Sequence, residues 1–257
     1  MGKLSGPVGS HATVPPELEE RVCERLGLGV DAVSTQIVSR DRHAHFVQTL
    51  ALIGASLERF ATEVRHLQRS EVGEAEEPFS SGQQGSSSMP HKRNPEKCER
   101  VCGLARILRA NSLAALENVA LWHERDISQS SVERVILPDS CLALDYILDL
   151  FTGIVRGLVV YPDRMRENME LTHGVVFSQR VLLAMVARGM NRQEAYPIVQ
   201  RAGHLALAER RPYRQTIAEE PQVSALFSAA ELDAIFDYSY YVREVDKSFA
   251  RMGLLQE

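Results

Sequence analysis

Aromatic residues are scarce in this chain, and long apolar runs are missing. Only 6% of its 257 residues are Phe, Trp or Tyr, a composition that favours helix over sheet. No apolar run reaches 18 residues and no basic-then-apolar leader opens the chain, so we expect no membrane partner and no secretion, but a cytoplasmic protein. The formal net charge of −5 gives no general attraction to nucleic acid, so an anionic ligand must meet a local group of cations.

Cysteine is also rare, which limits the metal and redox chemistry that the chain can carry. The cysteines are Cys23, Cys98, Cys102 and Cys141, and no CxxC pair or neighbouring His pair completes a zinc site. Cys98 and Cys102 are four residues apart, so they are expected to share one face of a helix. The spacing therefore predicts buried, reduced thiols, with no metal ion and no cofactor.

An unbroken heptad repeat of apolar residues predicts a long helix over residues 42–69. The repeat consists of Phe46, Leu50, Ile53, Leu57, Phe60, Val64 and Leu67. A strict period of 3.5 residues is typical of a helix that packs nearly parallel or antiparallel to other helices. We therefore expect this stripe to face partner helices in a bundle.

Two further long helices are expected after it. Asn94 and Pro95 form an N-cap followed by proline at the first helical position, which predicts a helix over residues 95–121. A third long helix is expected over residues 131–160, with Pro138 inside it.

The pair Tyr161-Pro162 then breaks the pattern and starts a series of shorter helices. We expect two domains, a helical bundle over residues 1–160 and a smaller helical domain over residues 161–257. The predicted fold is therefore all-α, without a sheet.

Residues 85–95 form the segment that carries chemistry, and they read Gly-Ser-Ser-Ser-Met-Pro-His-Lys-Arg-Asn-Pro. They predict a hydroxyl-rich loop before a helix N-terminus, where free N–H groups and the helix dipole favour an anion. His91, Lys92 and Arg93 add positive charge, in whose field a serine loses its proton more easily. From composition alone, a flexible Ser-rich linker explains the tract equally well. The acidic run at residues 74–77, before this tract, is expected to be a solvated loop.

The pattern Gly85-Ser86-Ser87-x-Met89-Pro90-x-Lys92-x-Asn94-Pro95 resembles the signature of the fumarase/aspartase superfamily. Its members are homotetrameric helical enzymes that release fumarate, or a close analogue, by β-elimination. Residues 34–43, residues 123–134 and the stretch around Tyr196 are similar to the adenylosuccinate lyase family. The resemblance implies a lyase of purine biosynthesis, acting on adenylosuccinate to give AMP and on the succinylated aminoimidazole carboxamide ribotide.

The resemblance also implies roles for residues of the signature. Ser86 would be the base that takes a proton from the succinyl carbon. Lys92 and Asn94 would stabilise the carbanion that forms, and Ser87 would bind the same end of the substrate. Glu99 would orient the catalytic histidine.

Other positions match residues that bind substrate in the family: Gln36, Arg100, Arg125, Ser130 and Arg134. The last three would hold the nucleotide, since the planar guanidinium of arginine suits phosphate. A solvated, charged helix face would look similar over residues 125–134, and that interpretation stays open.

The family pattern begins with a region that has no counterpart in this sequence and that would supply the general acid. We therefore expect the chain to carry the base half of the site and to be inactive alone, with a nucleotide substrate and further copies of a homotetramer as its partners. Two alternatives remain open. One is another superfamily enzyme, such as argininosuccinate lyase or carboxymuconate cycloisomerase, and the other is a noncatalytic oligomerising protein derived from the lyase.

Overall fold

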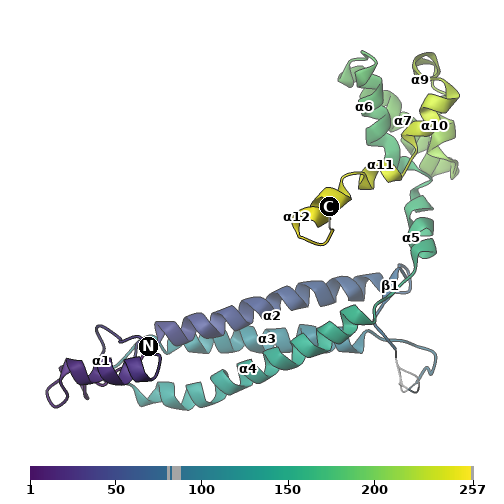
Figure 1. Cartoon of the computed structure of the whole chain (residues 1–257). Helices are drawn as coiled ribbons and strands as arrows, with labels where there is room; N and C mark the ends of the chain where they lie inside the picture. The colour runs from purple at the N-terminus through teal and green to yellow at the C-terminus, as the bar shows by residue number, and fades with distance from the viewer. Residues whose placement is uncertain (80–81, 83–87, 256–257) are drawn as a thin grey trace. The chain divides into compact units, whose positions relative to one another are not determined.

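The computed structural model describes residues 1–79, 82 and 88–255, and nearly every element in them is helical (Figure 1). The chain divides into two compact units, unit 1 (Met1–Tyr161) and unit 2 (Pro162–Glu257). The predicted helical fold is confirmed. The only named strands in the described part of the chain are β1 (Ala75–Glu76) and β2 (Val159–Val160), which pair antiparallel in unit 1. Two-residue strands leave no alternation in the sequence, so the prediction missed them.

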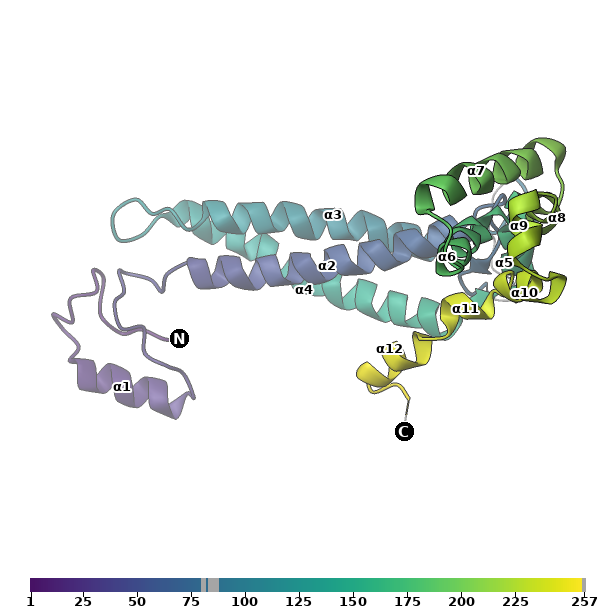
Figure 2. The same ribbon diagram turned by 90° about the horizontal axis from the view of Figure 1, so that it is seen from above.

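Unit 1 is built on three long helices that lie side by side (Figures 1 and 2). They are α2 (Asp41–Leu67), α3 (Glu96–Glu117) and α4 (Ile127–Arg156). The prediction placed the start of α4 near Ser131, which is too late. Asp126 caps the helix by accepting the Ser128 N–H at 3.0 Å, so the helix begins at Ile127.

The face that α2 buries differs from the predicted stripe. Its buried residues are mostly small: Ala44, Val47, Ala51, Gly54, Leu57, Ala61 and Val64. A Cβ on Gly54 would lie only 2.5 Å from Leu108 Cδ1 of α3, so the two helices approach closely there. Phe46, Ile53 and Phe60 are 48%, 38% and 53% exposed, because the close seam turns the larger side chains to its edge. Of the predicted stripe, Leu57 and Val64 are buried.

The core between the three helices includes two of the cysteines. Cys98 and Cys102 are buried on α3 as predicted, and burial, followed by the nearby Glu77 carboxylate, raises the pKa of the Cys98 thiol. Cys23 is also buried, but Cys141 is exposed, so the prediction was wrong there. Cys141 follows the buried Ser140 by one residue, and a step of one residue turns a side chain away from the buried face of α4.

The remaining helix of unit 1, α1 (Pro16–Arg25), begins at a proline and ends before Gly27, which has a φ of +66°. A positive φ favours glycine because it has no Cβ, so Gly27 suits the turn that follows the helix. The chain then returns to α2 through residues 28–40. In the part of the chain that the structure describes, no helix has the length and apolarity that a membrane crossing needs.

Unit 2 consists of short helices around a separate apolar core. Its largest fully buried side chains are Phe177, Met185, Tyr213 and Ile217. The α-helices are α5 (Pro162–Met169), α6 (Ser178–Ala187), α7 (Arg192–Glu209), α8 (Tyr213–Ala218), α9 (Pro221–Leu226), α10 (Ala229–Ile235), α11 (Ser239–Val242) and α12 (Val245–Arg251). Two 3₁₀ turns, η1 (Glu170–Thr172) and η2 (Val175–Phe177), join α5 to α6.

Candidate active site

A cleft of about 600 Å³ lies where the C-terminal end of α2 meets the end of the signature segment. Lys92 and Asn94 both line this cleft, so the structure brings these two predicted site residues together. Ser86 and Ser87, the predicted base and its neighbour, lie outside the described residues.

Cationic residues are in excess in the lining of the cleft. Such a local group of cations is what an anion site needs in a chain whose net charge is negative. Besides Lys92, its lining includes Arg65, Arg69 and Arg93, of which Arg93 is paired with Glu76, and His91 lines it as well. The acidic side chain in the lining is Glu71. An excess of cations in a concave site favours an anionic ligand such as a carboxylate.

The start of α3 differs from the prediction. Asn94 does not cap the helix, because Pro95 occupies the N-cap position and the helix begins at Glu96. The buried side chain of Glu77 takes over the capping role instead: its Oε1 accepts the Lys97 N–H at 3.1 Å and its Oε2 accepts the Cys98 N–H at 3.0 Å. The helix N-terminus therefore binds a carboxylate of the protein itself, and binding of a substrate anion falls to the cationic side chains.

Glu99 and Arg100 follow on the first turns of α3, and both are exposed. Arg100 forms an ion pair with Glu96 and donates a hydrogen bond of 3.2 Å to the Tyr146 hydroxyl. These hydrogen bonds, the one to Glu96 first, raise the pKa of the Arg100 guanidinium. Arg100 thus already has partners within unit 1, and Glu99 is open to contact from outside it.

The other predicted binding residues gather at the opposite end of the bundle. The Gln36 N–H donates to the carbonyl of Glu124, the residue before Arg125, at 3.2 Å. Arg134 Nη1 donates to Ser130 Oγ at 2.7 Å and to the Ser130 carbonyl at 3.2 Å. Gln36, Arg125 and Arg134 are all exposed, as a ligand-binding role requires.

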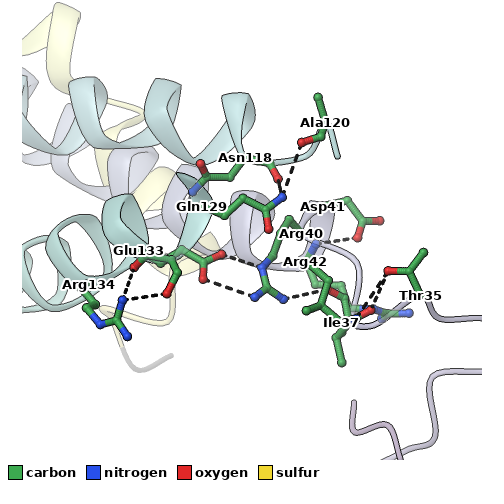
Figure 3. Close-up of polar contacts among 12 residues, drawn as sticks. Thr35, Ile37, Arg40, Asp41, Arg42, Asn118, Ala120, Gln129, Glu133 and Arg134 are labelled. Atoms are coloured by element: carbon green, nitrogen blue, oxygen red, sulfur yellow. Dashed lines mark hydrogen bonds and ion pairs between the residues drawn. The ribbon is translucent and has the colours of Figure 1, made fainter. Parts of the chain in front are cut away.

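Figure 3 shows how this second group is held in place. Arg40, just before α2, lies with its Nε 2.6 Å from Glu133 Oε1 of α4, and this pair connects the segment after Gln36 to the helix that carries Arg134. The buried Gln129 amide donates to the Asn118 carbonyl at 2.6 Å, which fixes the connection between α3 and α4. The charged stretch is therefore partly structural: Glu133 and Gln129 hold the fold, while the exposed arginines remain available.

The two groups of predicted site residues are far apart within one chain. α2 has 27 residues, and at 1.5 Å per residue its ends lie about 40 Å apart. Gln36 and the Arg125–Arg134 stretch adjoin the start of α2, whereas Lys92 and Asn94 adjoin its end. Within one copy of unit 1 the predicted site residues therefore form two separate groups, one at each end of α2.

Residues that line the cleft or support it were not all predicted. Arg65 and Arg69 are four residues apart in and just after the last turn of α2, a spacing that would have placed them on one side of the helix. Glu77 belongs to the acidic run that was predicted to be a solvated loop, and for this residue the prediction was wrong, since it is 1% exposed. No sequence pattern marks one acidic residue of such a run as buried.

Comparisons with known proteins match both units. A family model described as "Lyase" matches residues 1–108, and one described as "Adenylosuccinate lyase C-terminus" matches residues 174–252. An adenylosuccinate lyase from Synechocystis sp. is 51% identical over 255 residues, and one from Aquifex aeolicus is 51% identical over 251 residues. The chain belongs to the adenylosuccinate lyase family. The alignments cover 99% and 98% of this chain but only 59% and 57% of those two members of the family.

Solved structures of other enzymes share the fold of this chain. The 3-carboxy-cis,cis-muconate lactonizing enzyme from Pseudomonas putida is 32% identical, with a TM-score of 0.80 over 90% of this chain and 51% of that one. The β-carboxy-cis,cis-muconate cycloisomerase from Acinetobacter calcoaceticus sp. ADP1 is 24% identical, with a TM-score of 0.83 over 97% of this chain and 55% of that one. The identity to adenylosuccinate lyases is higher than either value.

Proposed function

We propose that this chain provides the proton-abstracting half of an adenylosuccinate lyase active site. The observation that carries the proposal is the cationic cleft in which Lys92 and Asn94 meet the end of α2. The family match supports the choice of substrate, since the named relatives are adenylosuccinate lyases. The chain spans somewhat more than half of their length, so the whole reaction is part of the proposal.

The reaction is a β-elimination, in which one proton leaves carbon and another is delivered to the leaving nitrogen. Ser86, as the base, takes a proton from the succinyl carbon next to a carboxylate, and the electron pair left on that carbon forms the double bond of fumarate. The bond between the neighbouring carbon and the purine nitrogen breaks, and the nitrogen receives a proton from a general acid. Adenylosuccinate gives AMP in this way, and the succinylated ribotide reacts by the same steps.

Lys92 and Asn94 act on the intermediate state. Proton removal spreads negative charge from the carbanion onto its carboxylate, and a fixed ammonium and amide stabilise that charge as it develops. Arg65 and Arg69 add a positive field from the end of α2. Ser87 binds the same end of the substrate, and Glu99 orients the histidine that acts as acid.

The nucleotide portion is held by the second half-site of another copy. Gln36, Arg125, Ser130 and Arg134 bind there, with the arginines on the phosphate. Because the half-sites of one copy lie about 40 Å apart, a complete site requires at least two copies, in accord with a homotetramer. Unit 1 is the bundle domain and unit 2 a C-terminal domain of a cytoplasmic enzyme that needs no cofactor.

A panel of substrates tests the proposal in a chain extended to the length of its relatives. Absorbance follows fumarate release from adenylosuccinate and argininosuccinate, and the loss of the conjugated diene of carboxymuconate as it closes to a lactone. We expect turnover of adenylosuccinate alone. Turnover of argininosuccinate instead would assign a different lyase, and the absence of turnover with all three would favour a noncatalytic protein.

A further inference from the structure

Residues 76–78, before the signature segment, are linked by side-chain contacts to residues 93–98, which include its end, and the central contact is made by a buried carboxylate. Glu77 lies before this segment and is 1% exposed, yet it remains hydrogen bonded through both carboxylate oxygens. Its partners are the N–H groups of Lys97 and Cys98, 20 and 21 residues further along. A carboxylate is stable in such a place only if its oxygens are used, so this contact is strongly determined by the fold.

Gln68 adds a second link at the same place. It is the C-cap residue of α2 and lines the cleft beside Lys92. Its Oε1 accepts the Glu77 N–H at 3.0 Å, and its Nε2 donates to the Arg93 carbonyl at 3.2 Å. One amide side chain therefore ties both Glu77, before the signature segment, and Arg93, within it, to the end of α2.

Outer contacts support these two links. Lys97 Nζ donates to the Pro78 carbonyl at 2.8 Å, and Arg93 forms an ion pair of 2.6 Å with Glu76. The Tyr161 hydroxyl donates to the same Glu76 carboxylate at 2.8 Å. These residues and the inner pair, Gln68 and Glu77, form what we call the brace.

The brace encloses a proposed catalytic residue between two fixed points. Arg93 is held at its carbonyl by Gln68, and Lys97 is held at its N–H by Glu77. Asn94 lies between these anchors, and Lys92 comes one residue before the first. With so few residues between the anchors, the backbone at Asn94 has little freedom to move relative to α2.

We propose that Glu77 is a positioning residue for the elimination, which holds Lys92 and Asn94 in place by fixing the start of α3 and does not touch the substrate. This inference rests on the proposed function. Groups that stabilise developing charge must already be in place when the charge forms, and a displacement of about 1 Å can lower the rate by about 10²-fold. A helix cap with no such role would contribute to stability and leave the rate unchanged.

Glu77→Gln tests the proposal, with Glu231→Gln as the matched control. The first variant puts an amide NH₂ against one of the two N–H groups, so at least one hydrogen bond is lost. Glu231 also caps a helix with its carboxylate, at α10 in unit 2, and takes no part in the brace. Amide hydrogen exchange at Lys97 and Cys98 should become about tenfold faster in E77Q and stay unchanged in E231Q.

Steady-state kinetics supply the second measurement, in the chain extended to the length of its relatives. We expect E77Q to lower kcat by about 10- to 100-fold with little change in KM, and E231Q to leave both at their original values. If E77Q does not fold, Gln68→Ala, which releases the Arg93 carbonyl, should show the same split between kcat and KM.

Two outcomes separate failure of the inference from failure of the proposed function. If the unsubstituted enzyme releases no fumarate from adenylosuccinate, the proposed function is rejected. If it does release fumarate but E77Q or Q68A works at the same rate, or exchange at Lys97 and Cys98 is unchanged, the positioning role is rejected and the proposed function stands.

Discussion

At the scale of single residues, Lys92 contributes a charge to a cleft that already holds several cations. Its ammonium is felt by the bound substrate and by the developing carbanion alike. Lys92→Ala should therefore raise KM and lower kcat together, with a fall in kcat/KM of about 10²-fold or more. Steady-state kinetics in the chain of full length measure both constants. Lys247→Ala, which removes an exposed lysine of α12 paired with Glu244, is the control and should behave like the unsubstituted enzyme.

Substitution of Ser86, in contrast, should lower the rate with little effect on substrate binding. If Ser86 is the base, Ser86→Ala lowers kcat by about 10²-fold or more. Substrate affinity changes much less, because Lys92, Arg125 and Arg134 still hold the anionic groups. Parallel measurements on Ser87→Ala and Ser88→Ala decide the matter, since similar mild losses in all three variants would mean that the serines are interchangeable and none is the base.

Residue identities in the signature could be proposed from the sequence, whereas the supporting contacts could not. Lys92 and Asn94 stand in a recognisable string, and the structure places them in one cleft. Glu77 and Gln68 became visible only in the fold, because their roles depend on which backbone N–H and carbonyl groups come near. A carboxylate that caps a helix 20 residues away leaves no local spacing to read.

At the scale of the elements, the close contact between α2 and α3 depends on glycine at one position. A Cβ at Gly54 would overlap the buried Leu108 side chain, so Gly54→Ala should destabilise the chain by about 1–3 kcal/mol. Gly103 of α3 is exposed and has no atom within 4 Å of its Cβ position, so Gly103→Ala should instead stabilise it by about 0.5–1 kcal/mol. Chemical unfolding followed by circular dichroism compares the two, and equal effects would contradict the packing described for α2.

The helix cap in unit 2 predicts a dependence of stability on pH. The Ser228 N–H and hydroxyl, together with Arg188, lower the pKa of Glu231 from 4.5 to about 2. A carboxylate whose pKa is lowered by folding stabilises the folded state above its ordinary pKa, and this contribution disappears as the pH falls through the lowered value. Glu231→Gln should thus lower the melting temperature at pH 7, and the difference from the unsubstituted chain should shrink between pH 4.5 and pH 2. A difference that stays constant over this range would show that the charge is not involved.

The positions of the helices along the chain could be predicted from the sequence better than the sides that they bury. A break such as Pro162 is local, so the helices lie within a few residues of where they were expected, although the Asp126 cap of α4 was missed. The buried face of α2 depends on how near α3 approaches, and small residues such as Ala51 and Gly54 allow the closer contact. An apolar repeat alone indicates that a helix packs in a bundle, but it does not say which side becomes the tightest seam.

At the scale of the whole molecule, the separation of the proposed half-sites determines which pairs of inactive variants can restore activity when they assemble together. Lys92 lies at one end of α2, and Arg134 lies on the helix that is tied to its other end. If each complete site takes one half from each of two copies, a Lys92→Ala chain still contributes a sound nucleotide half, and an Arg134→Ala chain still contributes a sound signature half. Neither variant alone has an intact site.

Mixed assemblies of these two inactive variants should therefore recover activity. After joint dissociation and reassembly of K92A and R134A chains of full length in equal amounts, about a quarter of the sites should combine two sound halves, because each half is sound with even odds. Fumarate release from adenylosuccinate measures the recovery. The control is a mixture of K92A with Asn94→Ala, whose defects lie at the same end, so every site keeps a damaged signature half and the mixture should stay inactive. Recovery in both mixtures, or in neither while each variant still assembles, would mean that the two ends of the bundle do not meet in a shared site.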